Sequence, residues 1–98
     1  MAFRVSPQVD AELDDIWLYI ATESSSVNVA DRVVDSITQQ FLLLSKHPYM
    51  GRRRDDLRPG LRSVTVGIYV VIYQVKGDDV LILHVVHGRR DIKEIVRQ

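Results

Sequence analysis

Cysteine is absent from this chain of 98 residues. Its absence excludes a disulfide scaffold, a thiolate metal site and a cysteine nucleophile. Long apolar runs are absent too, since none approaches the roughly 20 residues that a membrane-spanning helix needs, and the N-terminus lacks the apolar core of a signal peptide. We therefore expect a cytoplasmic protein without a membrane segment.

Net charge is also lacking, because 13 Lys and Arg residues balance 13 Asp and Glu residues. The two halves nevertheless differ in sign. Residues 1–46 contain three basic and seven acidic residues, which gives −4, whereas residues 47–98 contain ten basic and six acidic residues, which gives +4. The basic half is expected to attract polyanions or acidic protein segments.

The N-terminal half predicts a strand followed by two helices. Residues 2–5 favour a short strand, and apolar residues at helical spacing predict a helix from residue 7 to residue 22 or 23, with Ser6 as its N-cap. A second apolar stripe predicts a helix that starts near Ser26 or Asn28 and ends before Pro48. Because the connection between them is short, the two helices should form an antiparallel hairpin.

The C-terminal half has a different pattern, typical of strands. Charged residues with interspersed glycine and proline predict an irregular loop over residues 49–61. Three β-rich runs follow, and the tail favours either a short helix or an extension along the sheet edge; the four segments are 62–66, 69–75, 80–87 and 92–97. The order β-α-α-β-β-β predicts an α+β fold, in which the helix hairpin covers one face of an antiparallel-rich sheet. We expect residues 1–98 to form a single domain.

The histidines do not form a metal site in this pattern. His84 and His87 lie three residues apart in one predicted strand, so their side chains point to opposite faces of the sheet. His47, at a helix end before a proline, is expected to interact with the helix dipole. Glycine-rich phosphate loops and nucleophile elbows are also absent, so we expect neither a metal nor a cofactor.

Clustered arginines are the most informative polar residues. The guanidinium group matches phosphate and carboxylate geometry, so arginines in loops favour contacts with polyanions or acidic peptides. Arg89 and Arg90 directly follow a predicted strand end, which would fix their direction. Residues 52–54 have an alternative interpretation as solvated charges, and Arg52 in particular is expected to pair with nearby acids at little energetic consequence.

Two leucines fall outside the apolar stripes of the predicted helices. Leu18 lies between acidic residues on the helical wheel, and Leu42 lies far from Ile37 on its own helix. Scattered exposed leucines are ordinary in soluble proteins. The alternative is that they form part of a groove for a partner helix along the hairpin.

Six short motifs cover the chain from Phe3 to Arg97. They are Ser6-Pro7, Ile16-Trp17-x-Tyr19-Ile20-Ala21, Pro48-x-x-Gly51-Arg52, Leu57-x-Pro59-Gly60-Leu61-Arg62-Ser63, Gly67-x-Tyr69 and His87-Gly88-Arg89-Arg90-Asp91. Their order and spacing resemble the RelE/ParE toxin superfamily. The PGLRS and HGRRD sequences within them resemble the ParE branch in particular.

The resemblance implies a toxin of a type II toxin–antitoxin pair, neutralised by a cognate antitoxin with a DNA-binding domain and an acidic C-terminal segment. ParE-like members are known mainly as poisons of DNA gyrase. The resemblance implies no membrane partner and no sequence-specific nucleic-acid binding by the toxin alone. The residues expected to contact the target are Arg58, Arg62, His87, Arg89 and Arg90. Those expected to contact the antitoxin are Leu18, Leu42, Arg52 and Arg54.

RelE-like members instead cleave mRNA on the ribosome, using basic side chains and a C-terminal tyrosine as acid/base groups. The position of one RelE arginine corresponds here to Val70, that of the tyrosine falls near Val96, and no tyrosine follows Tyr73. Only Arg90 matches a basic residue of the nuclease site. These departures favour a non-catalytic gyrase inhibitor, with a ribosome-dependent mRNA endoribonuclease as the alternative.

Overall fold

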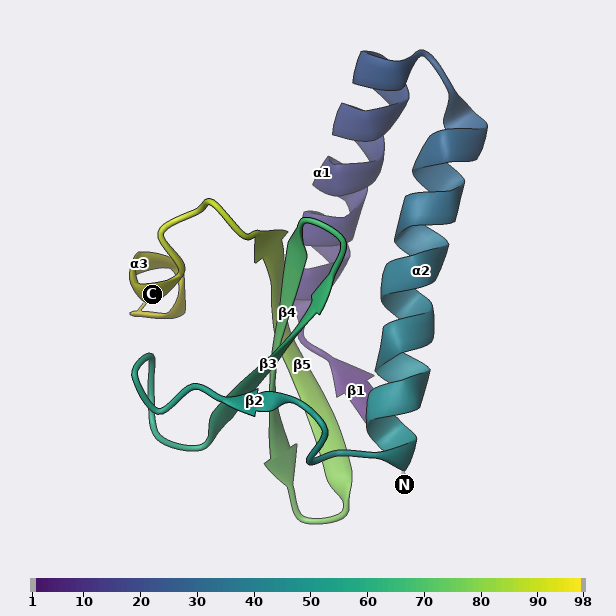
Figure 1. Cartoon of the computed structure of the whole chain (residues 1–98). Helices are drawn as coiled ribbons and strands as arrows, with labels where there is room; N and C mark the ends of the chain where they lie inside the picture. Colours follow the sequence, from purple (N-terminus) through teal and green to yellow (C-terminus); the bar gives the residue numbers. More distant parts are fainter. Residues whose placement is uncertain (1, 98) are drawn as a thin grey trace.

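A five-stranded sheet with a helix hairpin on one face makes up most of the fold (Figure 1). The computed structural model describes residues 2–97. The elements follow in the order β1 (Phe3–Val5), α1 (Pro7–Ser24), α2 (Val27–Lys46), β2 (Arg52–Arg53), β3 (Leu61–Val66), β4 (Tyr69–Lys76), β5 (Asp79–His87) and α3 (Ile92–Arg97).

The strands lie in the order β1-β5-β4-β3-β2, so the first and last strands of the chain are neighbours. β1 runs parallel to β5, with Phe3 opposite Val80, and the other pairs are antiparallel. This confirms the predicted α+β fold with an antiparallel-rich sheet. The hairpin of α1 and α2 packs on the sheet as expected (Figure 1).

The starts of the two long helices differ from each other. Ser26 caps α2, because its hydroxyl accepts the N–H of Val29 at 3.2 Å. Ser6 was also predicted to be a cap, but its side chain makes no capping bond to α1. Instead the Ser6 hydroxyl donates to the carbonyl of Leu83 at 3.0 Å, because the chain enters α1 directly from β1, beside β5. Proline at the first helical position starts α1 without an N–H that needs a partner.

The main core lies between the hairpin and the sheet. Its buried side chains are Val9, Ile16, Ile37, Phe41, Leu44, Tyr69, Val71, Tyr73, Val80, Ile82 and Val85. Full burial of one such apolar side chain contributes about 1.5–3 kcal/mol. This core therefore fixes the hairpin on the sheet. Because three of its residues belong to β5, it also fixes the end of β5 and the turn that follows it.

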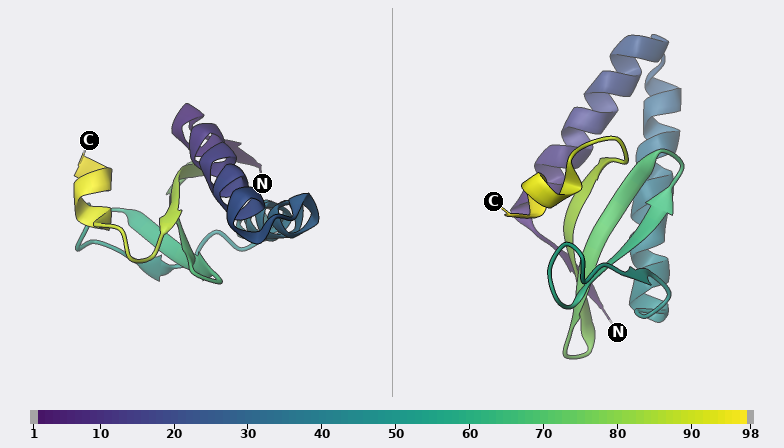
Figure 2. Two further views of the ribbon diagram at one scale, coloured as in Figure 1. Left: turned by 90° about the horizontal axis from the view of Figure 1, so that it is seen from above. Right: turned by 60° about the vertical axis from the view of Figure 1, so that its left-hand side comes forward.

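The opposite face of the sheet has a second, smaller core. It contains Leu61, Val70, Ile72, Val86 and Val96, with Leu57, Leu83, Ile92 and Ile95 packed around them. α3 and the loop before β3 supply this cover, so the sheet lies between the hairpin and α3 (Figure 2, left). The sequence pattern predicted the hairpin on one face and assigned no cover to the other; the tail folds as the helical alternative and buries its apolar side there.

Two irregularities were not predicted. The segment expected to be an irregular loop contains β2, which pairs Arg52 with Ser63 and Arg53 with Arg62. A strand of two residues is too short to produce a recognisable pattern. In β5, a β-bulge at Leu83 shifts the register, since Ile72 lies opposite His84 and Tyr73 opposite Ile82.

None of the helices between residues 2 and 97 is long and apolar enough to cross a membrane.

Candidate functional site

The turn from His87 to Asp91, which carries the HGRRD sequence, is held by several backbone hydrogen bonds. The N–H of Gly88 donates to the carbonyl of Ile68 at 2.8 Å, which ties the turn to the neighbouring β3–β4 turn. The N–H of Arg90 donates to the carbonyl of His87 at 3.0 Å, and the Nδ1 atom of His87 accepts the N–H of Arg89 at 3.0 Å. The histidine ring thus positions the arginine that follows it.

Arg89 and Arg90 are both exposed at this turn. Within residues 2–97 neither forms an ion pair. Asp91 accepts the N–H of Glu94 at 3.3 Å and so caps the start of α3. The turn is therefore fixed at both ends, and it presents two guanidinium groups that are free to contact another molecule.

A groove lies beside this turn, between α1 and the end of β5. We call it the β5-edge groove; its volume is about 770 Å³, and its lining includes Glu12, Ile16, Tyr19, Ile68, Tyr69, His84, Val85, His87 and Arg90. His87 packs edge-on against Tyr69, with ring centroids 5.9 Å apart. Burial raises the pKa of the Tyr69 phenol above its ordinary value.

Glu12 bridges α1 and β5 at the floor of the groove. One carboxylate oxygen accepts the N–H of Val85 at 2.8 Å, and the other lies 3.0 Å from the Nδ1 atom of His84. His84 is therefore engaged by a carboxylate, while His87 packs on Tyr69. Within the described residues no group of three His, Cys, Asp or Glu side chains could hold a metal ion.

Two of the four arginines in the segment before β3 are paired within it. Arg53 contacts Asp55 at 2.8 Å, and Arg54 binds both carboxylate oxygens of Asp56, at 3.1 and 3.2 Å. The Arg54 guanidinium lowers the pKa of Asp56 below its ordinary value. The expected pairing of Arg52 with these acids was wrong, because its two neighbours bind them. No ion pair of Arg52 occurs in residues 2–97.

Arg62 holds the segment after α2 in place. Its guanidinium donates to the carbonyls of Tyr49 and Gly51, at 3.2 and 2.8 Å, and lies 5.2 Å from the centroid of the Tyr49 ring. Arg62 lies near the start of β3, whereas the end of β3 leads to the β3–β4 turn with Ile68, which bonds to Gly88 in the turn that carries Arg90. The structure therefore does not bring Arg62 together with Arg89 and Arg90.

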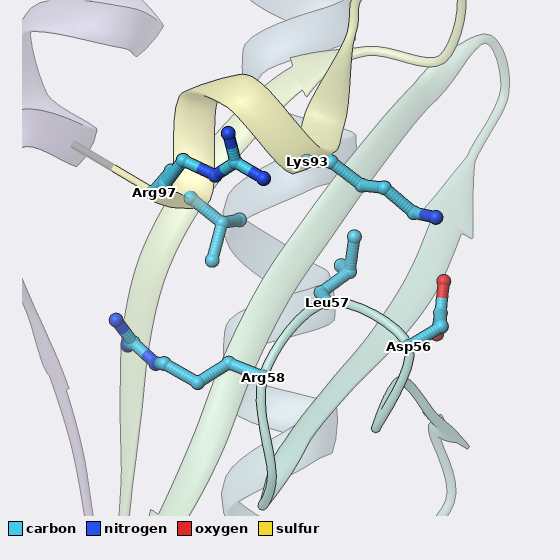
Figure 3. Close-up of a pocket in the computed structure, with 6 residues that line it drawn as sticks. Asp56, Leu57, Arg58, Lys93 and Arg97 are labelled. Carbon is cyan, nitrogen blue, oxygen red and sulfur yellow. The ribbon is translucent and has the colours of Figure 1, made fainter.

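Arg58 lines a separate basic pocket on the α3 face of the sheet, with a volume of about 250 Å³. Lys93 and Arg97 from α3 and Asp56 and Arg58 from the loop surround Leu57 (Figure 3). Sequence reasoning missed Lys93 and Arg97. Their separation by four residues, which places both on one side of a helix, is the signal that could have found them.

The two leucines outside the core stripes are exposed, Leu18 by 61% and Leu42 by 55%. They lie on different helices of the hairpin, and neither lines the β5-edge groove. Leu42 neighbours Leu43 and is followed along the chain by Tyr49 and Met50, all of them exposed.

The resemblance assigns the nuclease arginine to Val70 and the tyrosine to a position near Val96, and both valines are buried. Val70 and Val96 are exposed by only 8% and 5%, and both pack in the smaller core. Neither side chain can take up or release a proton.

The fold is shared with a chain of known structure, described as a chromosomal ParDE toxin–antitoxin system from P. aeruginosa. The match has a TM-score of 0.78 and 24% identity, and it covers 89% of this chain and 95% of that one. It places the protein among small α+β domains in which a helix hairpin packs on a sheet.

The particular family follows from the sequence matches. Residues 3–92 match the family described as the ParE toxin of the type II toxin–antitoxin system parDE, and the chain belongs to this family. It is 38% identical to Toxin ParE3 of Caulobacter vibrioides over 84 residues, which make up 86% of this chain and 83% of that toxin. It is 26% identical to Toxin ParE1 of Mycobacterium tuberculosis over 92% of both chains.

Proposed function

We propose that this toxin stalls DNA gyrase in the cytoplasm by binding it, without a catalytic step, and that a cognate antitoxin neutralises it. The observation that carries the proposal is the fixed turn with exposed, unpaired Arg89 and Arg90. Arginines held on a rigid scaffold suit binding to an acidic surface or a phosphate, because little conformational freedom is lost on contact.

A stoichiometric mode of action is supported by the lack of acid/base groups where RNA cleavage would need them. Val70 and Val96 are buried valines. General acid–base catalysis requires a side chain that can take up or release a proton, and valine has none.

Within the target surface we assign different roles to the basic residues. Arg89 and Arg90 contact the target directly, and His87 positions them. Arg58 contributes through the basic pocket, together with Lys93 and Arg97. Arg62 acts indirectly, because its guanidinium is bound by the carbonyls of Tyr49 and Gly51.

For the antitoxin we propose apolar contacts at Leu18 and Leu42 and an ionic contact at Arg52. Arg54, already bound to Asp56, contributes by keeping the neighbouring loop in shape. Apolar burial supplies most of the affinity, and the charges chiefly increase the association rate. Raising the salt concentration should therefore slow association and leave the complex intact, whereas dissociation at about 0.5 M salt would show that ionic contacts dominate.

The test of the target compares two purified reactions. DNA supercoiling by gyrase and cell-free translation are each titrated with the toxin, with and without equimolar antitoxin. Gyrase inhibition that saturates near one toxin per gyrase subunit, with translation unaffected, is the expected result. Inhibited translation with normal supercoiling would favour the alternative, an mRNA endoribonuclease of the RelE type. Of the basic residues in that nuclease site, only one has a match here, Arg90.

A further inference from the structure

One edge of the sheet is only partly covered. β1 pairs with β5 from Phe3 to Val5, opposite Val80 to Ile82, and no strand of the described chain pairs with this edge beyond Ile82. An uncovered strand edge presents backbone N–H and C=O groups that can pair with another extended chain. The stretch without a partner strand, Leu83–His87, is about 17 Å long at 3.3 Å per residue.

Side chains occupy the places of the missing strand. The Ser6 hydroxyl donates to the carbonyl of Leu83, and the Glu12 carboxylate accepts the N–H of Val85. Alternate residues of a strand direct their backbone groups to the same edge, so the N–H of His87 faces the same way as that of Val85. Gly88 confirms this alternation, because its N–H faces the other edge and bonds to Ile68.

The space beside this edge has the properties of a peptide site. The β5-edge groove runs along it, and Tyr19 and Ile68, at its rim, are exposed by 64% and 60%. Arg90 lines the end of the groove next to the fixed turn. Backbone groups along one side, apolar side chains at the rim and a cation at one end are complementary to an extended segment with apolar residues and an acid.

We propose that an extended segment of the antitoxin, about five residues long, binds as an additional strand along Leu83–His87. It takes over the N–H of Val85 from Glu12, covers Tyr19 and Ile68, and places an acidic side chain against Arg90. Main-chain pairing of this kind supplies affinity, while the side-chain contacts supply specificity. The inference rests on the proposed antitoxin, and it gives Arg90 a second role, since a bound antitoxin then covers a residue of the target surface.

An extended chain fits this edge better than a helix does. A helix satisfies its own backbone groups and would leave the N–H of His87 without an acceptor. A second copy of the toxin could pair edge to edge instead, and the experiment below distinguishes the two.

The experiment uses the full-length toxin and the purified protein encoded beside it. Amide hydrogen exchange is measured residue by residue for free and antitoxin-bound toxin. We expect the amides of Val85 and His87 to exchange at least about tenfold more slowly in the complex, since both become strand-paired. Unchanged exchange at both amides, in a complex that forms normally, would overturn the inference and leave the proposed antitoxin intact.

A matched pair of variants tests the groove itself. Ile68→Asp places a charge at the rim, whereas Val27→Asp places the same charge at an apolar residue of similar exposure at the tip of the hairpin (60% and 55%). Ile68→Asp should weaken antitoxin binding by at least about tenfold, as for a central contact residue, and Val27→Asp should leave it unchanged. Equal affinities for both variants would rule out the groove.

Two further outcomes are decisive. Complete absence of a complex with the wild-type toxin would remove the proposed antitoxin and the inference with it. Slow exchange of Val85 and His87 in the free toxin, increasing with concentration alongside a dimeric mass, would identify a second copy as the occupant and overturn the assignment to the antitoxin.

Discussion

The phenol oxygen of Tyr73 lies 2.9 Å from the backbone nitrogen of Gly51, in the space that a β-carbon at residue 51 would occupy. The same hydroxyl donates to the carbonyl of Pro48 at 2.8 Å. One fully buried side chain thus satisfies both an acceptor and a donor in the segment between α2 and β2. The motif Pro48-x-x-Gly51-Arg52 thus has a physical basis: the Pro48 carbonyl accepts the Tyr73 hydroxyl, and only glycine leaves room for the Tyr73 ring at residue 51.

Gly51→Ala should therefore destabilise the protein. A β-carbon there would come within 2.7 and 2.9 Å of two ring carbons of Tyr73, and overpacking of this kind costs about 1–3 kcal/mol. Urea denaturation measures the loss. Because Tyr73→Phe removes the oxygen nearest to the new atom, the double variant should lose less than the sum of the single variants. Strict additivity would show that the ring and residue 51 do not interact.

Alkaline pH gives an independent test of the same tyrosine. Burial raises the pKa of the Tyr73 phenol, outweighing the opposite effects of the Gly51 N–H and Arg62. The folded protein therefore keeps a proton that the unfolded chain releases near pH 10. The resulting contribution to the free energy of unfolding is fully present below about pH 10 and is lost as the pH rises through the folded pKa. Tyr73→Phe should lose less stability than the wild type between about pH 9.5 and 11, measured by urea denaturation.

Arg62 and Arg52 should differ in their effect on stability. Arg62→Ala removes two hydrogen bonds to carbonyls and a cation–π contact, so we expect a loss of about 1–3 kcal/mol. Arg52→Ala removes an exposed side chain and should change stability by less than about 0.5 kcal/mol. Thermal melting of both variants provides the comparison. Identical melting curves would mean that the bonds of Arg62 contribute nothing net.

Arg90→Ala should abolish or strongly weaken toxicity without unfolding the protein. The side chain is exposed, and the backbone of the turn is held by bonds that do not involve the guanidinium. Growth arrest after induction without antitoxin, measured beside the melting temperature, tests this expectation, with Arg52→Ala as the matched control. If Arg90→Ala stays fully toxic, the target surface lies elsewhere. If it loses toxicity and its melting temperature also falls by several degrees, the role of the arginine is structural.

The sequence patterns were sufficient for the two long helices, the three long strands and the exposed positions of Leu18 and Leu42, but they left the tail open between a helix and an extended segment. They could not predict features that depend on contacts between distant residues. Arg52, Arg54 and Arg62 look alike in the sequence, yet their roles diverge once Asp56, Tyr49 and Gly51 come within reach. Likewise Glu12 reads as one of several acids near a helix start, and only the position of β5 shows that it bonds to Val85.

The parallel pairing of β1 with β5 has a consequence for how the toxin is made. Phe3 lies opposite Val80, so the first strand can find its partner only after almost the whole chain has been synthesised. Contacts between residues so far apart in the sequence form slowly, because a long loop must close before they contribute to stability. Arg89 and Arg90 come after β5 in the chain and therefore emerge from the ribosome later still. An interrupted translation product would thus lack both the complete sheet and the residues proposed to do harm, and a newly made antitoxin would have time to meet the toxin while it folds.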